Sequence, residues 1–294
     1  MQAIRRPIQI VLPTTYDAEA KRTRKTRPNS VVRIQDEATR AWNLHTALYY
    51  KAGGSPWRMV RQRSDLDACY VGIGFYKSLD EEHVMTSMAQ VFDERGEGLI
   101  VRGGRVELSK EDRTPHLSAE DSFDLLMEAL RQYRREHLNA PARVVVHKSS
   151  LFNPAEVEGF LRAAAERDVE YPDLLSMRRS PTRLFRDGGY PPLRGTLLHL
   201  DDASVCLYTK GSVDFFRTYP GMYVPKPLGI VRAHSEQTLT FLAGEVLALT
   251  KMNWNNTQFD GGEPITLKAA DRVGDVLKYL GEADWVAPRY SYYM

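Results

Sequence analysis

The chain has 294 residues, enough to bury a substantial core, and its 43% hydrophobic and 27% charged residues are typical of globular proteins. No apolar run is long enough to span a bilayer, and the start "MQAIRRPIQIVLPTTY" lacks a signal-peptide cleavage site, so we expect a cytoplasmic protein without a membrane partner. The only two cysteines, Cys69 and Cys206, exclude a disulfide framework and a cysteine-based zinc site.

The net charge of +2 leaves the kind of partner open, so the position of the basic residues matters more than their number. The run "KRTRKTRP" at 21–28 carries five basic residues and no acid. The run "MRRSPTRLFRDGG" at 177–189 carries four arginines, beginning with Arg178 and Arg179. Each run alone is typical of a solvated loop, but the two together favour nucleic acid as a partner.

The N-terminal part of the chain is predicted to form short elements joined by polar segments. In chain order we expect a strand at 7–12, a basic loop at 13–34 and a helix at 36–51. Gly53 and Gly54 follow this helix and end it. The turn from Gly53 to Pro56 is the one candidate boundary, between a small piece at 1–50 and a body at 51–294.

The body is predicted to begin with strands and to continue with helices and strands in alternation. An apolar run at 68–76 predicts a buried strand, and two strand-like runs within 87–108 complete an antiparallel meander. Ser118 and Asp121 resemble a capping box that starts a helix at 119–137. The later elements expected are a strand at 142–150, a helix from Asn153, a further helix, a hairpin of "GTLLHL" and "SVCLYT", and a helix from Thr266 to Leu280. This order is ribonuclease-H-like, an α/β fold with a mixed central sheet flanked by helices.

Six motifs stand in a fixed order along the chain, which ends in "YSYYM". They are "AWNLHTALYYKAGGSPWRM", "YVGIGFY", "VVVHKSSLFNPAEVEGF", "GSVDFFRTYPGMYVPKPL", "LTKMNWNNTQFDG" and "PITLKAADRVG". Each is weak alone, but the ordered set resembles the PIWI domain of prokaryotic Argonautes over residues 40–294. The resemblance implies a PIWI fold at 51–294, preceded at 1–50 by the edge of a Mid domain and the Mid–PIWI connection.

Argonautes hold the 5′ phosphate of a short guide strand where Mid meets PIWI, and the resemblance carries this pocket onto three residues. Lys51 matches the lysine before the paired glycines, whose ammonium can meet a phosphate as a point charge. Gln9 matches the pocket glutamine, which can donate to a phosphate oxygen. The carboxylate of Met294 matches the terminal group that helps to hold Mg²⁺ against the phosphate. A second family lysine is replaced by Ala47.

Other roles for these residues stay open at this point. Lys51 also fits a lysine that merely favours the helix dipole, and Gln9 also fits an ordinary strand residue. The aromatic C-terminal tail also fits simple packing on the body.

Argonautes that cleave their targets hold two divalent cations between acidic residues. The resemblance places Gly74 at the first acidic position, Lys148, followed by Ser149, at the second, and Asp271 at the fourth. One carboxylate cannot hold two metal ions, and a lysine repels a dication, so we expect no catalytic residues and no slicing. His147 ends an apolar strand with no acid nearby in sequence, and we expect it to be structural.

The sequence therefore favours guide-directed nucleic-acid binding by a slicing-deficient PIWI module. The module would hold the guide 5′ end and the guide–target duplex, and Lys148, Arg178 and Arg179 would contact phosphates. We expect it to act in prokaryotic defence together with an effector protein. Guide and target can each be RNA or DNA. One alternative is a divalent-metal-dependent guide-directed endonuclease with relocated acids. Another is a protein-interaction scaffold that has lost nucleic-acid binding.

Overall fold

The computed structural model describes residues 5–17, 19, 22–24, 27–32, 34–60, 66–92, 98–108, 114–185, 191–213, 224–252, 261–281, 284–287 and 289–293. The strands are β1 (Arg22–Arg24), β2 (Arg27–Val32), β3 (Ala68–Lys77), β4 (Val84–Phe92), β5 (Gly98–Leu108), β6 (Pro115–His116), β7 (Arg143–Lys148), β8 (Tyr171–Arg179), β9 (Leu197–His199), β10 (Ser204–Leu207) and β11 (Leu228–His234). The helices are α1 (Pro13–Tyr16), α2 (Glu37–Lys51), α3 (Ala119–His137), α4 (Pro154–Glu166), α5 (Leu239–Leu249), α6 (Ile265–Leu277) and the 3-10 turn η2 (Tyr290–Tyr292).

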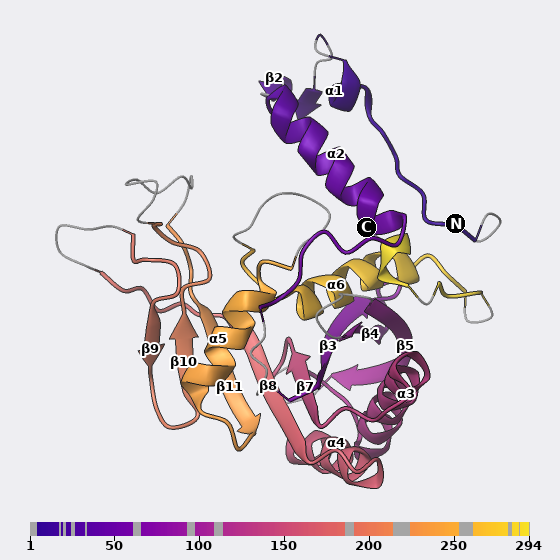
Figure 1. Ribbon diagram of the computed structural model, residues 1–294, viewed down its shortest axis with the longest axis vertical. Coiled ribbons are helices and arrows are strands. Elements are labelled where there is room, and N and C mark those ends of the chain that lie inside the picture. Colours follow the sequence, from indigo (N-terminus) through magenta and orange to yellow (C-terminus); the bar gives the residue numbers. More distant parts are fainter. Residues whose placement is uncertain are drawn as a thin grey trace.

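Nine of these strands form one mixed sheet in the described part of the chain, in the order β6-β5-β4-β3-β7-β8-β11-β10-β9 (Figure 1). β3, β4 and β5 form an antiparallel meander, while β7 and β8 join β3 in parallel. The parallel pairs are connected through α3 and α4, as parallel strands require a crossover. The meander and β7 were predicted from the sequence, β8 continues the ribonuclease-H-like order, and β11, β10 and β9 extend it in antiparallel fashion.

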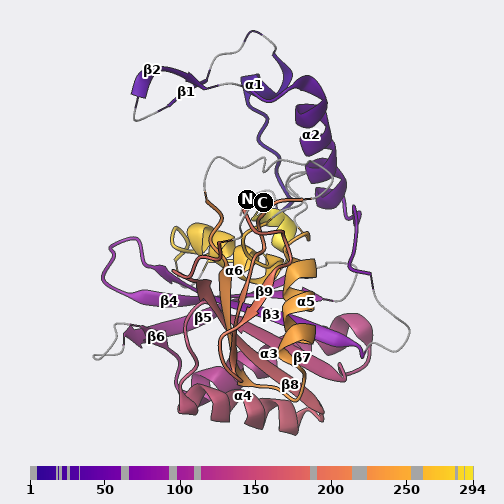
Figure 2. The ribbon, with the colours of Figure 1, turned by 90° about the vertical axis from the view of Figure 1, so that its left-hand side faces the viewer.

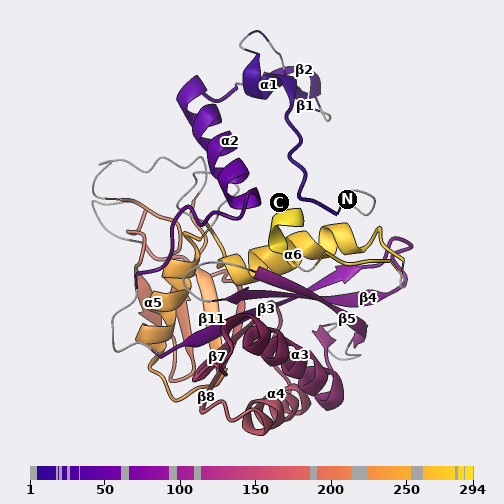
Figure 3. The same ribbon diagram turned by 45° about the vertical axis from the view of Figure 1, so that its right-hand side comes forward.

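The sheet is covered on both faces, and each face has its own core. α3 and α4 lie on one face, and α5 and α6 lie on the other (Figure 3). Neighbouring residues of β7 alternate between the two: Val144 and Val146 pack with α3 and α4, whereas Val145 packs with α5 and α6. This alternation follows from the pleat of a strand, and it determines which side chains of β7 can belong to the same site.

Helix α6 lies unusually close to the central strand β3. A Cβ built on Gly72 would be 2.2 Å from the carbonyl oxygen of Thr266, so only a glycine permits this approach. On β4, the buried Ser87 hydroxyl donates to the carbonyl oxygen of Ala270 at 3.0 Å. These two contacts fix the height and rotation of α6 over the sheet.

The N-terminal elements extend away from the sheet as an arm, with the β1–β2 hairpin far from the body (Figure 2). α2 begins at Asp36, whose carboxylate accepts the backbone N–H of Thr39 at 2.9 Å. The Tyr292 hydroxyl donates to the carbonyl oxygen of Arg5 at 2.7 Å, so the C-terminal turn touches the N-terminal segment. The proposed division between residues 50 and 51 stays a prediction.

Most of the predicted elements are confirmed, and three are wrong. The helix before the glycine pair, the meander, the helices at 119–137 and from Asn153, the hairpin and the late helix are present. Residues 7–12 form no strand, because they run as an irregular segment into α1. The segment 13–34, expected to be a loop, contains α1, β1 and β2. The further helix expected after α4 is strand β8, which the sheet places between β7 and β11. In the described residues, no helix has the length and apolarity needed to cross a membrane.

The close approach of α6 to β3 predicts an asymmetry between two glycines. Gly72→Ala should lower the free energy of unfolding by about 3 kcal/mol, because its methyl group overlaps the Thr266 carbonyl. Gly104→Ala on β5, where no atom lies within 4 Å of the Cβ position, should change it by less than about 1 kcal/mol. Urea unfolding of both variants measures this, and equal stabilities would contradict the packing described.

Candidate functional site

Gly74 and Asp271, the first and fourth positions of the predicted nuclease site, lie side by side. A Cβ built on Gly74 would be 3.0 Å from Asp271 Oδ1 and 3.2 Å from Ser87 Oγ. The fold therefore brings the two positions together across the β3–α6 contact. What they supply is one carboxylate and one residue without a side chain.

Asp271 has an unusual carboxyl group for a residue on the outer side of a helix. The residue is exposed as a whole, yet its carboxyl lies against β3 beside Gly74. Partial burial, followed by the negative charges of Glu263 and Asp275, raises the pKa of Asp271 to about 6. The carboxyl thus holds a proton at a pH where an ordinary aspartate is ionised.

Lys148 does not point into this site, and the reason is the pleat of β7. His147 faces α6, where its Nδ1 is 2.8 Å from Thr266 Oγ1, and burial lowers its pKa to about 3. Lys148, the next residue, must face the opposite side, and it lies over the rings of Phe75 and Phe152 in the core under α3 and α4. The placement of His147 fits the structural role expected from sequence.

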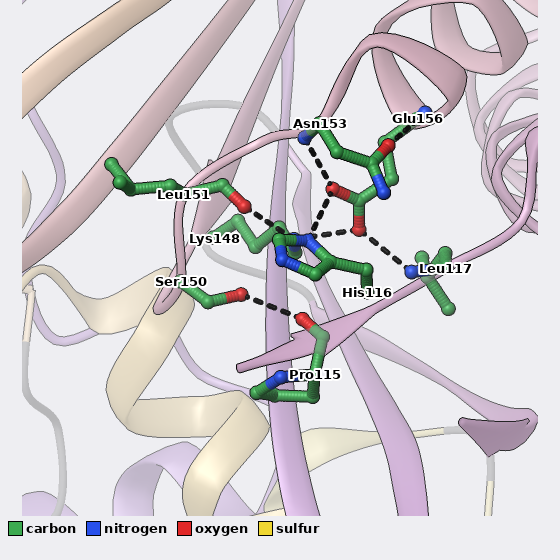
Figure 4. Close-up of polar contacts among 8 residues, drawn as sticks. All are labelled: Pro115, His116, Leu117, Lys148, Ser150, Leu151, Asn153 and Glu156. Atoms are coloured by element: carbon green, nitrogen blue, oxygen red, sulfur yellow. Dashed lines mark hydrogen bonds and ion pairs between the residues drawn. The ribbon is translucent and has the colours of Figure 1, made fainter. Parts of the chain in front are cut away.

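Lys148 instead forms a buried ion pair with Glu156 (Figure 4). The two side chains are fully buried, and Lys148 Nζ is 2.6 Å from Glu156 Oε1 and donates to the carbonyl oxygen of Leu151 at 2.9 Å. Glu156 also accepts the backbone N–H groups of Leu117 and Asn153. A phosphate contact would require the ammonium to abandon this carboxylate, which is costly for a buried charge, so the placement does not fit the contact expected of Lys148.

Ser149 follows Lys148 just beyond the end of β7. In the parallel pairing of β3 with β7, Ile73 is opposite Lys148, and Ser149 N–H donates to the carbonyl oxygen of Ile73 at 3.4 Å. The residue after Lys148 therefore returns to the α6 side of the sheet, where it is exposed. The assignment of Lys148 to the second position stays a prediction, and the alternation of His147, Lys148 and Ser149 along the strand is the sequence signal that bears on it.

The second predicted site, at the end of α2, is assembled from residues far apart in sequence. Lys51 Nζ donates to Gln9 Oε1 at 2.8 Å and to the carbonyl oxygen of Ile8 at 2.7 Å. Partial burial lowers the pKa of Lys51. Gly53, at φ +94°, turns the chain sharply after the helix, a conformation that favours glycine.

Met294, the third predicted member of this site, lies outside the described residues. The turn η2, just before it, packs against α2. The described residues at the site offer a lysine and two neutral oxygens already bonded to it, an arrangement that does not fit a bound Mg²⁺.

A further group of charged side chains lies around α6. The sequence predicted Arg178 and Arg179 as binding residues, but it did not single out Lys268 and Arg272. Arg178 and Arg179 are exposed at the end of β8, and Arg179 Nε is 3.7 Å from Glu263 Oε1. Burial and the charges of Arg272 and Lys210 lower the pKa of Lys268. The signal missed was the spacing of Lys268 and Arg272, which places both on one side of a helix.

One group of possible metal ligands lies elsewhere. Asp80, Glu82 and His83, in the turn between β3 and β4, have ligand atoms within 4.8 Å of one another. It is the only such trio in the described residues, and it does not include Asp271. Exposed acidic groups of this kind are common without a metal ion.

The raised pKa of Asp271 predicts a pH-dependent effect of Asp271→Asn. Ionisation of Asp271 opposes folding above pH 6, so the variant should be more stable than wild type at pH 8, by about 1 kcal/mol after discounting for solvent exposure. The difference should shrink as the pH falls through 6 and vanish below 4, where the wild-type carboxyl is protonated in both states. Urea unfolding at pH 4, 6 and 8 measures it. Asp124→Asn on α3 is the control, and a pH-independent difference for Asp271→Asn would contradict the assignment.

Comparisons with known proteins identify the fold. No family model and no curated protein sequence matches the chain. Clostridium butyricum Argonaute bound to a guide DNA and a 19-mer target DNA matches with a TM-score of 0.68 and 15% identity, covering 86% of this chain and 32% of that one. Marinitoga piezophila Argonaute in complex with 5′ OH guide RNA matches with a TM-score of 0.59 and 14% identity, covering 88% of this chain and 37% of that one. Aa-Ago with externally bound siRNA matches with a TM-score of 0.63 and 16% identity, covering 87% of this chain and 34% of that one. The chain thus spans about a third of each of these Argonautes, and it has the ribonuclease-H-like PIWI fold.

Proposed function

We propose that this chain binds a guide strand by its 5′ end, holds the guide–target duplex and does not cleave the target. The observation that carries the proposal is the contact between Lys51 and Gln9 at the end of α2. These are the two residues that the resemblance assigns to the phosphate pocket, and 42 positions separate them in sequence. Support also comes from the solved Argonautes that share the fold, which are bound to guide DNA, guide RNA or siRNA.

The geometry at Lys51 suits a phosphate. Gln9 Oε1 now accepts from the ammonium, in the place that a phosphate oxygen would take. Rotation of the Gln9 amide would release this acceptor and present its NH₂ group to the same phosphate. Lys51 and Gln9 would then both donate to one anion, and charge-assisted bonds of this kind are about twice as strong as neutral ones.

The duplex would lie along the charged surface at the start of α6. Lys268, Arg272 and Lys210 interact there through their charges, and Arg179 approaches the same surface through Glu263. Contacts of lysine and arginine with phosphates position a duplex without reading its sequence, which base pairing with the guide supplies. Affinity should therefore fall steeply with salt.

The proposed absence of cleavage is supported by the donor set at Gly74. In-line displacement by two metal ions needs cations about 3.5–4 Å apart, each held by carboxylates. Gly74 and Asp271 lie side by side, and the predicted second position, Lys148, faces the other side of the sheet, so the predicted positions supply a single carboxylate here.

A metal-dependent endonuclease with relocated acids is the second candidate. Glu263 and Asp275 lie close enough to Asp271 to raise its pKa, so three carboxylates share one region of α6. Rearrangement on binding a duplex would be needed to bring them onto two metal ions. A bridging Mg²⁺ through the Met294 carboxylate, an effector partner, a cytoplasmic location and a role in prokaryotic defence stay predictions.

The phosphate pocket predicts a preference for a 5′-phosphorylated guide. Wild-type protein should bind such a guide at least tenfold more tightly than the same strand with a 5′ hydroxyl, since the phosphate gains charge-assisted bonds of about 1.5–3 kcal/mol. Lys51→Ala should remove the preference and leave the affinity for the hydroxyl guide almost unchanged. Filter binding with RNA and DNA guides measures both. Arg162→Ala on α4 removes the same charge elsewhere, and a preference that survives Lys51→Ala would exclude Lys51 from the pocket.

The site at Gly74 predicts retention of the target without cleavage. Protein loaded with a guide should hold a labelled complementary strand on a filter, and the strand should stay intact with Mg²⁺ or Mn²⁺ at pH 8, where Asp271 is ionised. Turnover that Asp271→Asn abolishes would favour the endonuclease. Failure to retain any target would favour the scaffold hypothesis.

A further inference from the structure

A pocket rich in arginine lies on the face of the sheet opposite α6. Its cavity of about 170 Å³ is lined by Leu130, Arg131, Arg134, Arg135, Ala140, Pro141 and Arg167. α3 contributes three of the arginines near its C-terminal end, and the fourth, Arg167, is the C-cap of α4. Figure 3 shows α3 and α4 together on this face, away from α6. The pocket is therefore separate from the site at Gly74.

The positive charge of this pocket is poorly compensated within the described residues. Arg131 pairs with Glu128, but Arg134, Arg135 and Arg167 have no carboxylate partner there. Arg131, Arg134 and Arg135 are exposed, so water and salt screen their mutual repulsion, but their positive charge around one small cavity still favours an anion there.

Arginines in the last turn of a helix also complement the helix dipole, and this would account for Arg134 and Arg135 without any ligand. It does not account for Arg167. The Nε atom of Arg167 is buried and has no hydrogen-bond partner in the described part of the chain. A buried donor without an acceptor is costly, and rotation of the Arg167 side chain would present this group to an anion in the pocket.

We propose that this pocket binds the phosphate group of a small phosphorylated compound. The planar fork of arginine matches phosphate oxygen atoms in pairs, which favours phosphate over a monovalent anion. Leu130, Ala140 and Pro141 give the pocket an apolar wall, suited to a carbon group next to the phosphate. The cavity is smaller than the usual 300–1,000 Å³ of ligand pockets, so the rest of the compound would lie outside it. This site does not depend on guide binding.

Titration calorimetry with inorganic phosphate, AMP and adenosine in 0.15 M NaCl tests the proposal. Phosphate and AMP should bind, and adenosine should not. Tighter binding of AMP than of phosphate would show that the apolar wall contributes, whereas equal affinities would assign the binding to the phosphate group alone. The double variant Arg134→Ala/Arg167→Ala should bind both at least tenfold more weakly.

Two further variants keep the test independent of folding. Arg162→Ala, on α4, removes an arginine that pairs with Glu120 outside the pocket and should bind like wild type. Arg167→Lys keeps the charge but loses the fork, and should bind at an intermediate level. Absence of binding at millimolar phosphate and AMP, or wild-type affinity in the folded double variant, would overturn the proposal. So would arginine-dependent binding of a polynucleotide but of neither small probe.

Discussion

The structure depends on the close packing of α6 against β3. Gly72 allows the backbone of α6 to approach the strand, and the Ser87 hydroxyl holds the helix at Ala270. The same packing buries His147 against Thr266 and places Asp271 beside Gly74. A contact made for stability thus also determines which groups meet at the predicted nuclease position, where one carboxylate lies beside a glycine.

Two lysines at predicted sites show how the surroundings of a charge decide its role. Lys148 is enclosed with Glu156, whose carboxylate also caps α4, so this ion pair joins β7 to the start of α4. Lys51 is only partly buried, and its acceptors include a carbonyl and a side-chain amide that can rotate. Exchange of a neutral acceptor for a phosphate costs far less than separation of a buried ion pair, so Lys51 is the one suited to a ligand.

Local patterns predicted much of the fold. The apolar run of β3, the capping box at Asn153 and the stripe of α3 each depend on residues close in sequence, and all three elements formed as expected. β8 was mistaken for a helix because its strand character comes from its position between β7 and β11. The site was harder to predict than the fold. Alternation along β7 separates Ser149 from Lys148, and the ion pair of Lys148 with Glu156 can be recognised only in the folded chain.

The central claim is that this PIWI fold binds nucleic acid but lacks the carboxylate ligands needed to hold two metal ions. Anomalous diffraction from crystals of the protein with guide and target, soaked in Mn²⁺ at pH 8, tests this most directly. The account predicts an ordered duplex along α6 and no pair of manganese peaks beside Gly74, Ser149 and Asp271. Two such peaks about 4 Å apart, astride a target phosphate, would contradict it.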